Sequence, residues 1–158
     1  QDDFPPNFCT GLITSATMER AAYAKVTAGT TIVEVIATAG FEATAHRAGD
    51  GYKYEEVDGH FQVPGTVNLM IFTNKALTDG ALTRAVITAT EAKTLAIQEA
   101  GITMLDSDLP ASGTATDGLI LTIDTNGEVL TDTGSFSLFG DTLAKAVRQA
   151  MAQAIANI

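Results

Sequence analysis

The sequence predicts a single layered α/β (α+β) domain, in which long helices pack on a mixed sheet. Two apolar, β-branched segments, residues 30–38 and 67–72, have the composition of strands. Two further segments, residues 79–100 and 137–157, have apolar residues at helical spacing and recognisable end signals. Strands and helices therefore alternate within 158 residues, which is the length of one domain.

The N-terminal part of the chain is expected to form a helix followed by a strand. Thr14 or Ser15 can cap a helix in which suitable residues follow at helical spacing, namely Met18, Ala21, Ala22 and Lys25. Residues 30–38, TTIVEVIAT, are β-branched and bounded by glycines, which predicts a strand.

The middle of the chain is expected to hold an irregular excursion and a buried strand. Residues 41–63 are rich in glycine and charge, and a loop of that length in a compact domain is usually functional or mobile. Residues 67–72 form an almost continuous apolar run, which predicts a strand buried on both faces. Residues 74–79 are then expected to form a turn.

The C-terminal half is expected to contain helix, strand, turn and helix. Asp79 is the predicted cap of a helix that ends at Gly101. Residues 117–124 predict a second buried strand, and Thr-Asn-Gly at 125–127 predicts a hairpin turn before a short segment. Residues 137–157 predict the final helix through its apolar stripe.

Charge and cysteine content narrow the possible partners. The net charge is −10 and the pI is about 4.4, which argues against binding to nucleic-acid phosphates or anionic membrane surfaces. No run reaches the roughly 18–20 apolar residues of a transmembrane helix. Cys9 is the single cysteine, so no intrachain disulfide can form, and a cytoplasmic location is expected. His46 and His60 fit no zinc motif, so no metal is expected.

Polar residues gather on the predicted helix 79–100. Arg84, Thr88 and Glu91 are spaced to share one face, and Thr90 and Lys93 lie on an adjacent stripe. A solvated outer face is one interpretation. The other is a packed polar wall facing a ligand, because threonine is a poor helix former and an unusual choice for a merely exposed surface.

Two loops of small residues could also bind a ligand. In residues 112–118, SGTATDG, the backbone can approach a ligand closely and its N–H groups can hold an anion, while Asp117 can act as general base. The alternative is a tight turn in which Asp117 bonds its own backbone. Residues 133–137 precede the last helix and could hold an anion or an oxyanion, although simple capping explains them as well.

The ordered set of these motifs resembles the adenosylcobinamide amidohydrolase (CbiZ) family. The resemblance covers nearly the whole chain from Gly11 onward and is specific as a set, although each motif alone is weak. The matching segments are TAG at 38–40, RAGD at 47–50, PGTVN at 64–68, TATEAKT at 88–94, SGTATD at 112–117 and a glycine-containing loop at 134–140.

This resemblance implies hydrolysis of the amide that joins the corrin ring to aminopropanol in adenosylcobinamide, which gives adenosylcobyric acid during cobamide salvage. A corrinoid is then the substrate, and no further cofactor is expected. Catalysis would use Asp117 or Glu91 as base, Thr114 or Thr116 as nucleophile or orienting group, and Lys93 to stabilise charge. The substrate-binding residues implied by motif position are Gly40, Arg47, Asp50, Thr66, Asn68, Thr90, Gly113, Gly134 and Ser135.

The chain departs from the family pattern in three ways. Phe136 stands where the resemblance implies a histidine, and Thr44 stands where it implies an asparagine. The family is also longer at its N-terminus, so an N-terminal segment can be missing here. These departures leave open a protein of the same fold that binds a corrinoid or another small molecule without hydrolysing it. The Ala-rich helix, at residues 143–155, could pair subunits in a homo-oligomer.

Overall fold

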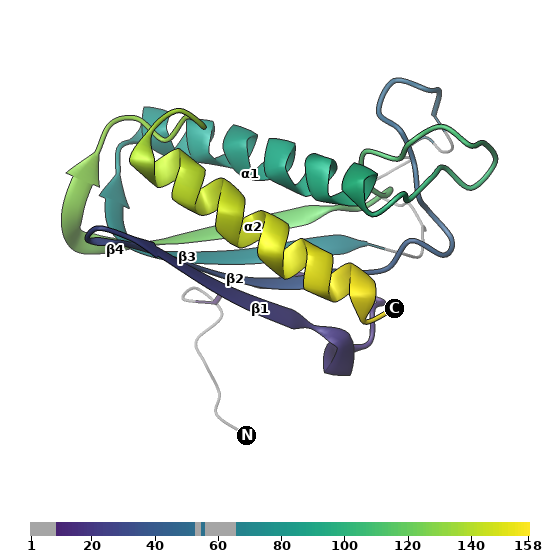
Figure 1. The fold of residues 1–158 in the computed structure, drawn as a ribbon, viewed down its shortest axis with the longest axis horizontal. Coiled ribbons are helices and arrows are strands. Elements are labelled where there is room, and N and C mark those ends of the chain that lie inside the picture. The colour runs from purple at the N-terminus through teal and green to yellow at the C-terminus, as the bar shows by residue number, and fades with distance from the viewer. Residues whose placement is uncertain (1–8, 53–54, 56–65) are drawn as a thin grey trace.

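The computed structural model describes residues 9–52, 55 and 66–158. These residues form one four-stranded sheet and two long helices (Figure 1). The strands are paired in chain order, the first three antiparallel and the last two parallel, which makes the sheet mixed. The elements are β1 (Ala22–Ala28), β2 (Thr31–Ala39), β3 (Val67–Leu77), α1 (Asp79–Glu99), β4 (Gly118–Leu130) and α2 (Leu138–Ala156), preceded by a short 3₁₀ turn at Met18–Arg20.

Both helices cover the same face of the sheet (Figure 1). Helix α2 packs against β1, β2 and α1, and α1 continues this layer toward β3 and β4. The core between the layers is closed by fully buried side chains, among them Val35, Leu69, Ile71, Leu143 and Met151. The expected α+β fold, a mixed sheet with long helices packed on it, is confirmed.

The predicted N-terminal helix is wrong, because the segment forms only a short 3₁₀ turn at Met18–Arg20 and then, from Ala22, the start of strand β1. Ala22 and Ala24 are buried against the helices, whereas Tyr23 and Lys25 point to the other side. This alternation has the period of two that a strand requires. Alanine is common in helices, and its presence at every second position made the two periods hard to distinguish.

Strand β3 is longer than predicted, and the turn expected at 74–79 is wrong. The strand continues to Leu77, and Thr78 alone separates it from α1. Asn74 does not initiate a turn, because its side chain bonds the neighbouring β1–β2 hairpin: Oδ1 accepts from the N–H of Ile32 and Nδ2 donates to the carbonyl of Thr30. The prediction that this strand is buried on both faces is also wrong, since Met70 and Phe72 remain partly exposed.

Strand β4 is continuous where a hairpin was predicted at 125–127, so that prediction is wrong. The register against β3 shifts there: Thr73 pairs with Ile123, but Lys75 pairs with Glu128. Asn-Gly therefore marks an irregularity in the strand. Gly127 is needed because an added Cβ would clash with the backbone carbonyl oxygen of Asn74 and would lie 3.1 Å from the backbone nitrogen of Ala76. As the edge strand, β4 is also partly exposed rather than buried.

The two predicted long helices are confirmed, with small changes at their ends. Thr78 caps α1 one residue before the expected Asp79, through a bond from the N–H of Ala81. Gly101 follows the helix with a φ of 71°, as a helix-ending glycine should. Ser137 caps α2 by accepting from the N–H of Gly140 at 3.0 Å. Within the described part of the chain, neither helix is long and apolar enough to cross a membrane.

Two loops extend beyond one end of the sheet (Figure 1). One is residues 40–52, the described part of the predicted excursion at 41–63, and it is irregular as expected; most of the remainder lies outside the described residues. The other is residues 101–117, between α1 and β4. A backbone bridge between His46 and Gly113 joins the two loops. Residues far apart in the sequence therefore meet at this end.

Candidate functional site

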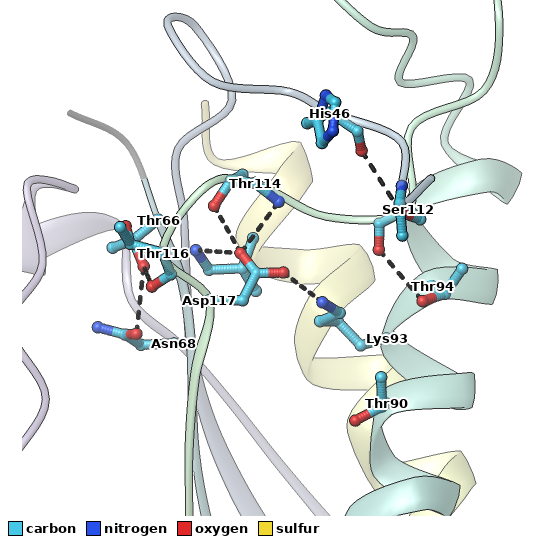
Figure 2. A network of polar contacts seen from close by, with 12 residues as sticks. His46, Thr66, Asn68, Thr90, Lys93, Thr94, Ser112, Thr114, Thr116 and Asp117 are labelled. Carbon is cyan, nitrogen blue, oxygen red and sulfur yellow. Dashed lines mark hydrogen bonds and ion pairs between the residues drawn. The ribbon is translucent and has the colours of Figure 1, made fainter. Parts of the chain in front are cut away.

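The centre of the candidate site is an ion pair between Lys93 and Asp117 (Figure 2). Lys93 lies in the second half of α1, and Asp117 immediately precedes β4. The Lys93 ammonium contacts Oδ2 of Asp117, and the two side chains are only 11% and 19% exposed. Buried charges must be paired and hydrogen-bonded to persist, so the protein holds both groups in a defined arrangement here.

The other oxygen of Asp117 is held by three donors from the protein. Oδ1 accepts from the backbone N–H of Thr114 at 3.1 Å, from the Thr114 hydroxyl at 2.5 Å and from the backbone N–H of Val67 at 3.2 Å. Asp117 thus bonds the backbone of its own loop, as the tight-turn interpretation required, and also contacts Lys93. The carboxylate is fixed in position and orientation by strand β3, helix α1 and its own loop.

Gly113 has no side chain, and the ion pair occupies the space that a side chain would fill. A Cβ at this position would lie 2.9 Å from Nζ of Lys93 and closer still to Oδ2 of Asp117. The backbone of Gly113 has no positive φ, so the requirement for glycine here is steric and not conformational. This close approach explains why the loop that carries Thr114 and Asp117 begins with a residue lacking a side chain.

Thr66 and Asn68 support the site from the start of β3 (Figure 2). The Thr66 hydroxyl donates to the carbonyl of Thr116 at 2.5 Å and lies 3.3 Å from Oδ1 of Asn68. The Asn68 amide nitrogen donates to the carbonyl of Ile13 at 2.9 Å. These buried residues therefore hold the loop and the N-terminal segment against the sheet.

The far side of the loop is fixed by α1 and the 40–52 loop. The Thr94 hydroxyl donates to the carbonyl of Ser112 at 3.1 Å. The hydroxyl of Ser112 accepts from the N–H of Ala48 at 2.9 Å, and its N–H donates to the carbonyl of His46 at 2.9 Å. Thr94 and His46 were not among the predicted site residues. Thr94 ends the TATEAKT motif, so its place in that motif was the available signal.

Other predicted residues lie outside this centre. Thr90 is exposed and its hydroxyl bonds the carbonyl of Val86 in its own helix. Glu91 is exposed on α1, and two residues along a helix face different directions, so it does not share the face of Lys93. Arg47 and Asp50 form an exposed pair at 3.8 Å. Gly40 donates its N–H to the carbonyl of Thr66 at 3.1 Å, at the edge of the site.

The loop before α2 lies toward the other end of α1. Gly134 packs against Arg84, since an added Cβ would lie 2.5 Å from Nε of that residue. Arg84 is nine residues from Lys93 along the helix, which is about 13 Å at 1.5 Å per residue. Ser135 follows Gly134, and Phe136 is fully exposed. The structure therefore does not bring these residues together with Asp117.

A pocket of about 560 Å³ lies beside the ion pair, because Thr114 forms part of its wall and also bonds Asp117. It was not predicted, because most of its wall comes from residues outside the matching motifs. Its lining residues are Ala43, Thr44, Ala45, His46, Tyr52, Met104, Leu105, Asp106, Thr114 and Ala115. Among the described residues, no group of three or more His, Cys, Asp or Glu side chains is placed to hold a metal ion.

Comparison with known proteins gives a consistent result. A family model described as adenosylcobinamide amidohydrolase (CbiZ) matches residues 1–158. The uncharacterized protein MJ1613 of Methanocaldococcus jannaschii is 39% identical over 158 residues, covering 91% of this chain and 61% of that protein. An adenosylcobinamide amidohydrolase of Halobacterium salinarum is 34% identical over 119 residues, covering 75% of this chain and 48% of that protein. The chain thus spans about half to three-fifths of the length of these relatives.

Proposed function

Because the chain belongs to the adenosylcobinamide amidohydrolase (CbiZ) family, we propose that it hydrolyses the amide between the corrin ring and aminopropanol of adenosylcobinamide. The products would be adenosylcobyric acid and aminopropanol, in the salvage of corrinoids. The observation that carries the proposal is the arrangement of Lys93, Asp117 and Thr114, which offers a cation, a carboxylate and a hydroxyl within contact of one another.

The base is assigned to Asp117 and the nucleophile to Thr114. A carboxylate offers about four lone-pair sites, and four donors already contact Asp117. Of these donors, the Thr114 hydroxyl is the one whose deprotonation creates an oxygen nucleophile. Its 2.5 Å bond to Oδ1 places the proton next to its acceptor, which is the geometry that general-base activation needs.

We assign to Lys93 the role of stabilising the negative charge that develops on the amide oxygen. An ammonium carries three donors, and one of them contacts Asp117. The remaining donors can face an oxyanion beside Thr114. Because Lys93 is only 11% exposed, its charge acts in a region of low dielectric, where such stabilisation is strongest.

The proposed reaction proceeds in two stages, through an ester on Thr114. The Thr114 oxygen attacks the amide carbon and its proton passes to Asp117. The tetrahedral intermediate then collapses, and Asp117 returns the proton to the departing nitrogen. Aminopropanol is released, and the corrinoid acyl group remains bound to Thr114 as an ester. Water then attacks the ester with Asp117 again as base, which releases the corrinoid carboxylic acid and restores the hydroxyl.

Release of aminopropanol from adenosylcobinamide is the direct test. Asp117→Asn should lower kcat by about 10²–10⁴-fold, the usual worth of a general base. Thr114→Ser keeps a hydroxyl and should retain activity, whereas Thr114→Val should remove it. Equal activity of Thr114→Val and the wild type would overturn the assignment of the nucleophile, and full activity in Asp117→Asn would overturn that of the base.

A second candidate is binding of a corrinoid without hydrolysis. It is favoured by Phe136, which is fully exposed at the position where the resemblance implies a histidine. On this hypothesis, the Lys93–Asp117 pair orients a ligand and transfers no proton. A change in the corrinoid absorption spectrum on mixing, with no aminopropanol released, would support the binding protein over the enzyme.

A further inference from the structure

The pocket beside Lys93 and Asp117 is close enough to the ion pair to hold another part of the same molecule. Thr114 lies in its wall and also bonds Asp117. The wall is built by the two loops at this end of the sheet, which the His46–Gly113 bridge joins. Its volume of about 560 Å³ is in the range of sites for drug-sized molecules, roughly 300–1,000 Å³.

The lining of the pocket suits a neutral, flat group. Alanine, Met104 and Leu105 supply apolar surface, and the rings of His46 and Tyr52 offer faces on which a heterocycle can stack. Among the described lining residues there is no Lys or Arg, and Asp106 contributes a carboxylate. A phosphate or other anion is therefore disfavoured, whereas a group with hydroxyl donors is not.

Thr44 provides a buried polar group without a partner. The residue is 7% exposed, and among the described residues its hydroxyl is the buried side-chain polar atom that makes no hydrogen bond. Such a group lowers stability, so its presence in a pocket wall calls for a compensating use. Thr44 lines the pocket, so a change between staggered χ1 rotamers can present the hydroxyl to a ligand at nearly constant volume.

We propose that this pocket binds the adenosyl group of the corrinoid, with Thr44 as a specificity-determining contact. The inference rests on the proposed function for the substrate. The adenosyl group is neutral, its purine is flat and carries hydrogen-bonding atoms for Thr44, and its ribose hydroxyls can face Asp106. A nucleoside fits a pocket of this size, whereas the much wider corrin ring remains outside it, against the Lys93–Asp117 end.

The test compares the affinities for adenosylcobinamide and cyanocobinamide, which share the amide and the ring. The wild type should prefer the adenosyl form. Ala43→Phe should fill the pocket and weaken binding of that form by about tenfold or more, with little change for the cyano form. Ala152→Phe makes the same change at an exposed alanine of α2 and should leave both affinities unchanged.

The role of Thr44 is tested by measuring ligand affinity and thermal stability, which its substitution should change in opposite directions. Thr44→Val should weaken adenosylcobinamide binding by about 3- to 10-fold while raising the melting temperature, because it removes the unpaired hydroxyl. Thr44→Ser keeps the hydroxyl and should keep the preference. A higher melting temperature with unchanged preference would overturn the role of Thr44.

A final measurement separates this inference from the proposed function. Binding of 5′-deoxyadenosine to the wild type, lost in Ala43→Phe, supports the pocket assignment even where no aminopropanol is released. Equal affinity of the wild type for both corrinoids, with no binding of 5′-deoxyadenosine, overturns it even where hydrolysis is observed. Equal weakening of both corrinoids by Ala43→Phe also overturns it, because the pocket would then hold part of the ring.

Discussion

Replacing Gly113 by alanine tests the centre of the site with a single methyl group. The added Cβ would lie 2.9 Å from Nζ of Lys93, and nearer to Asp117 Oδ2. Ordinary contacts to carbon lie at about 3.5–4.0 Å, so one or both partners must move by about 1 Å. A displacement of that size in a catalytic constellation costs about 10²-fold in rate. On the proposed hydrolase function, we therefore expect kcat/KM for adenosylcobinamide to fall about 100-fold.

The stability of the same variant should fall only modestly. Overpacking of this kind costs about 1–3 kcal/mol, and the alanine adds no backbone strain because Gly113 has no positive φ. Gly80→Ala is the matched control, since an added Cβ there meets nothing within 4 Å. Alanine within a helix is favoured over glycine by about 0.5–1 kcal/mol, so this control should be active and no less stable.

The assay is aminopropanol release at saturating and limiting substrate, with unfolding in urea measured in parallel. Gly134→Ala gives a second control, because its Cβ would displace only the exposed side chain of Arg84, far along α1 from Lys93. A Gly113→Ala enzyme that folds cooperatively and keeps near wild-type kcat/KM would refute the reasoning. So would an equal loss of activity in Gly134→Ala.

Three further predictions concern residues away from the ion pair. Glu91→Ala should change activity by no more than about threefold, as is usual for an exposed side chain, and a loss as large as that of an Asp117 variant would contradict its exclusion from the site. Thr133→Val should lower the free energy of unfolding in urea by about 0.5–1.5 kcal/mol with activity retained, because the fully buried hydroxyl would no longer donate at 2.6 Å to the carbonyl of Ala81 in α1. The hydrogen bond from Lys25 holds the pKa of Glu34 below its ordinary value, so the stabilisation by this pair is present above the unfolded-state pKa and is lost as the pH falls through the lowered one. NMR titration should find the Glu34 pKa higher in Lys25→Met, and an unchanged value would contradict the pairing.

The sequence predicted the elements whose signals are local and strong. Residues 30–38 and the helices at 79–100 and 137–157 were found because β-branched runs, capping residues and a terminal glycine agree with one another at each of them. The failures lie where one residue type serves two structures. Alanine in β1 fits a helix as well as a strand, and Asn74 is a turn residue by composition but is held in β3 by bonds to Thr30 and Ile32.

The site could be predicted in its composition but not in its geometry. TATEAKT and SGTATD were recognised as motifs, and Glu91 was predicted as a base and Lys93 as a charge-stabilising group, yet the sequence could not say which of the two would lie next to Asp117. That choice depends on the rotation of α1 about its axis, which is set by the packing of the buried alanines Ala85, Ala89, Ala92 and Ala96 into the core. The pocket depended even more on tertiary structure, since Met104 and Leu105 carry no motif.

The mixed sheet explains why the site lies where it does. In an open parallel sheet, ligands bind beyond the carboxyl ends of the strands. Here Asp117 and Thr66 instead precede β4 and β3, at the amino ends of the parallel pair. Because β2 runs antiparallel to β3, its carboxyl end lies at this same end of the sheet and leads into the 40–52 loop there. Helix α1 returns over the edge and delivers Lys93 in its second half. A site at this edge thus needs the antiparallel hairpin as well as the parallel crossover, so it depends on the whole fold and not on one motif.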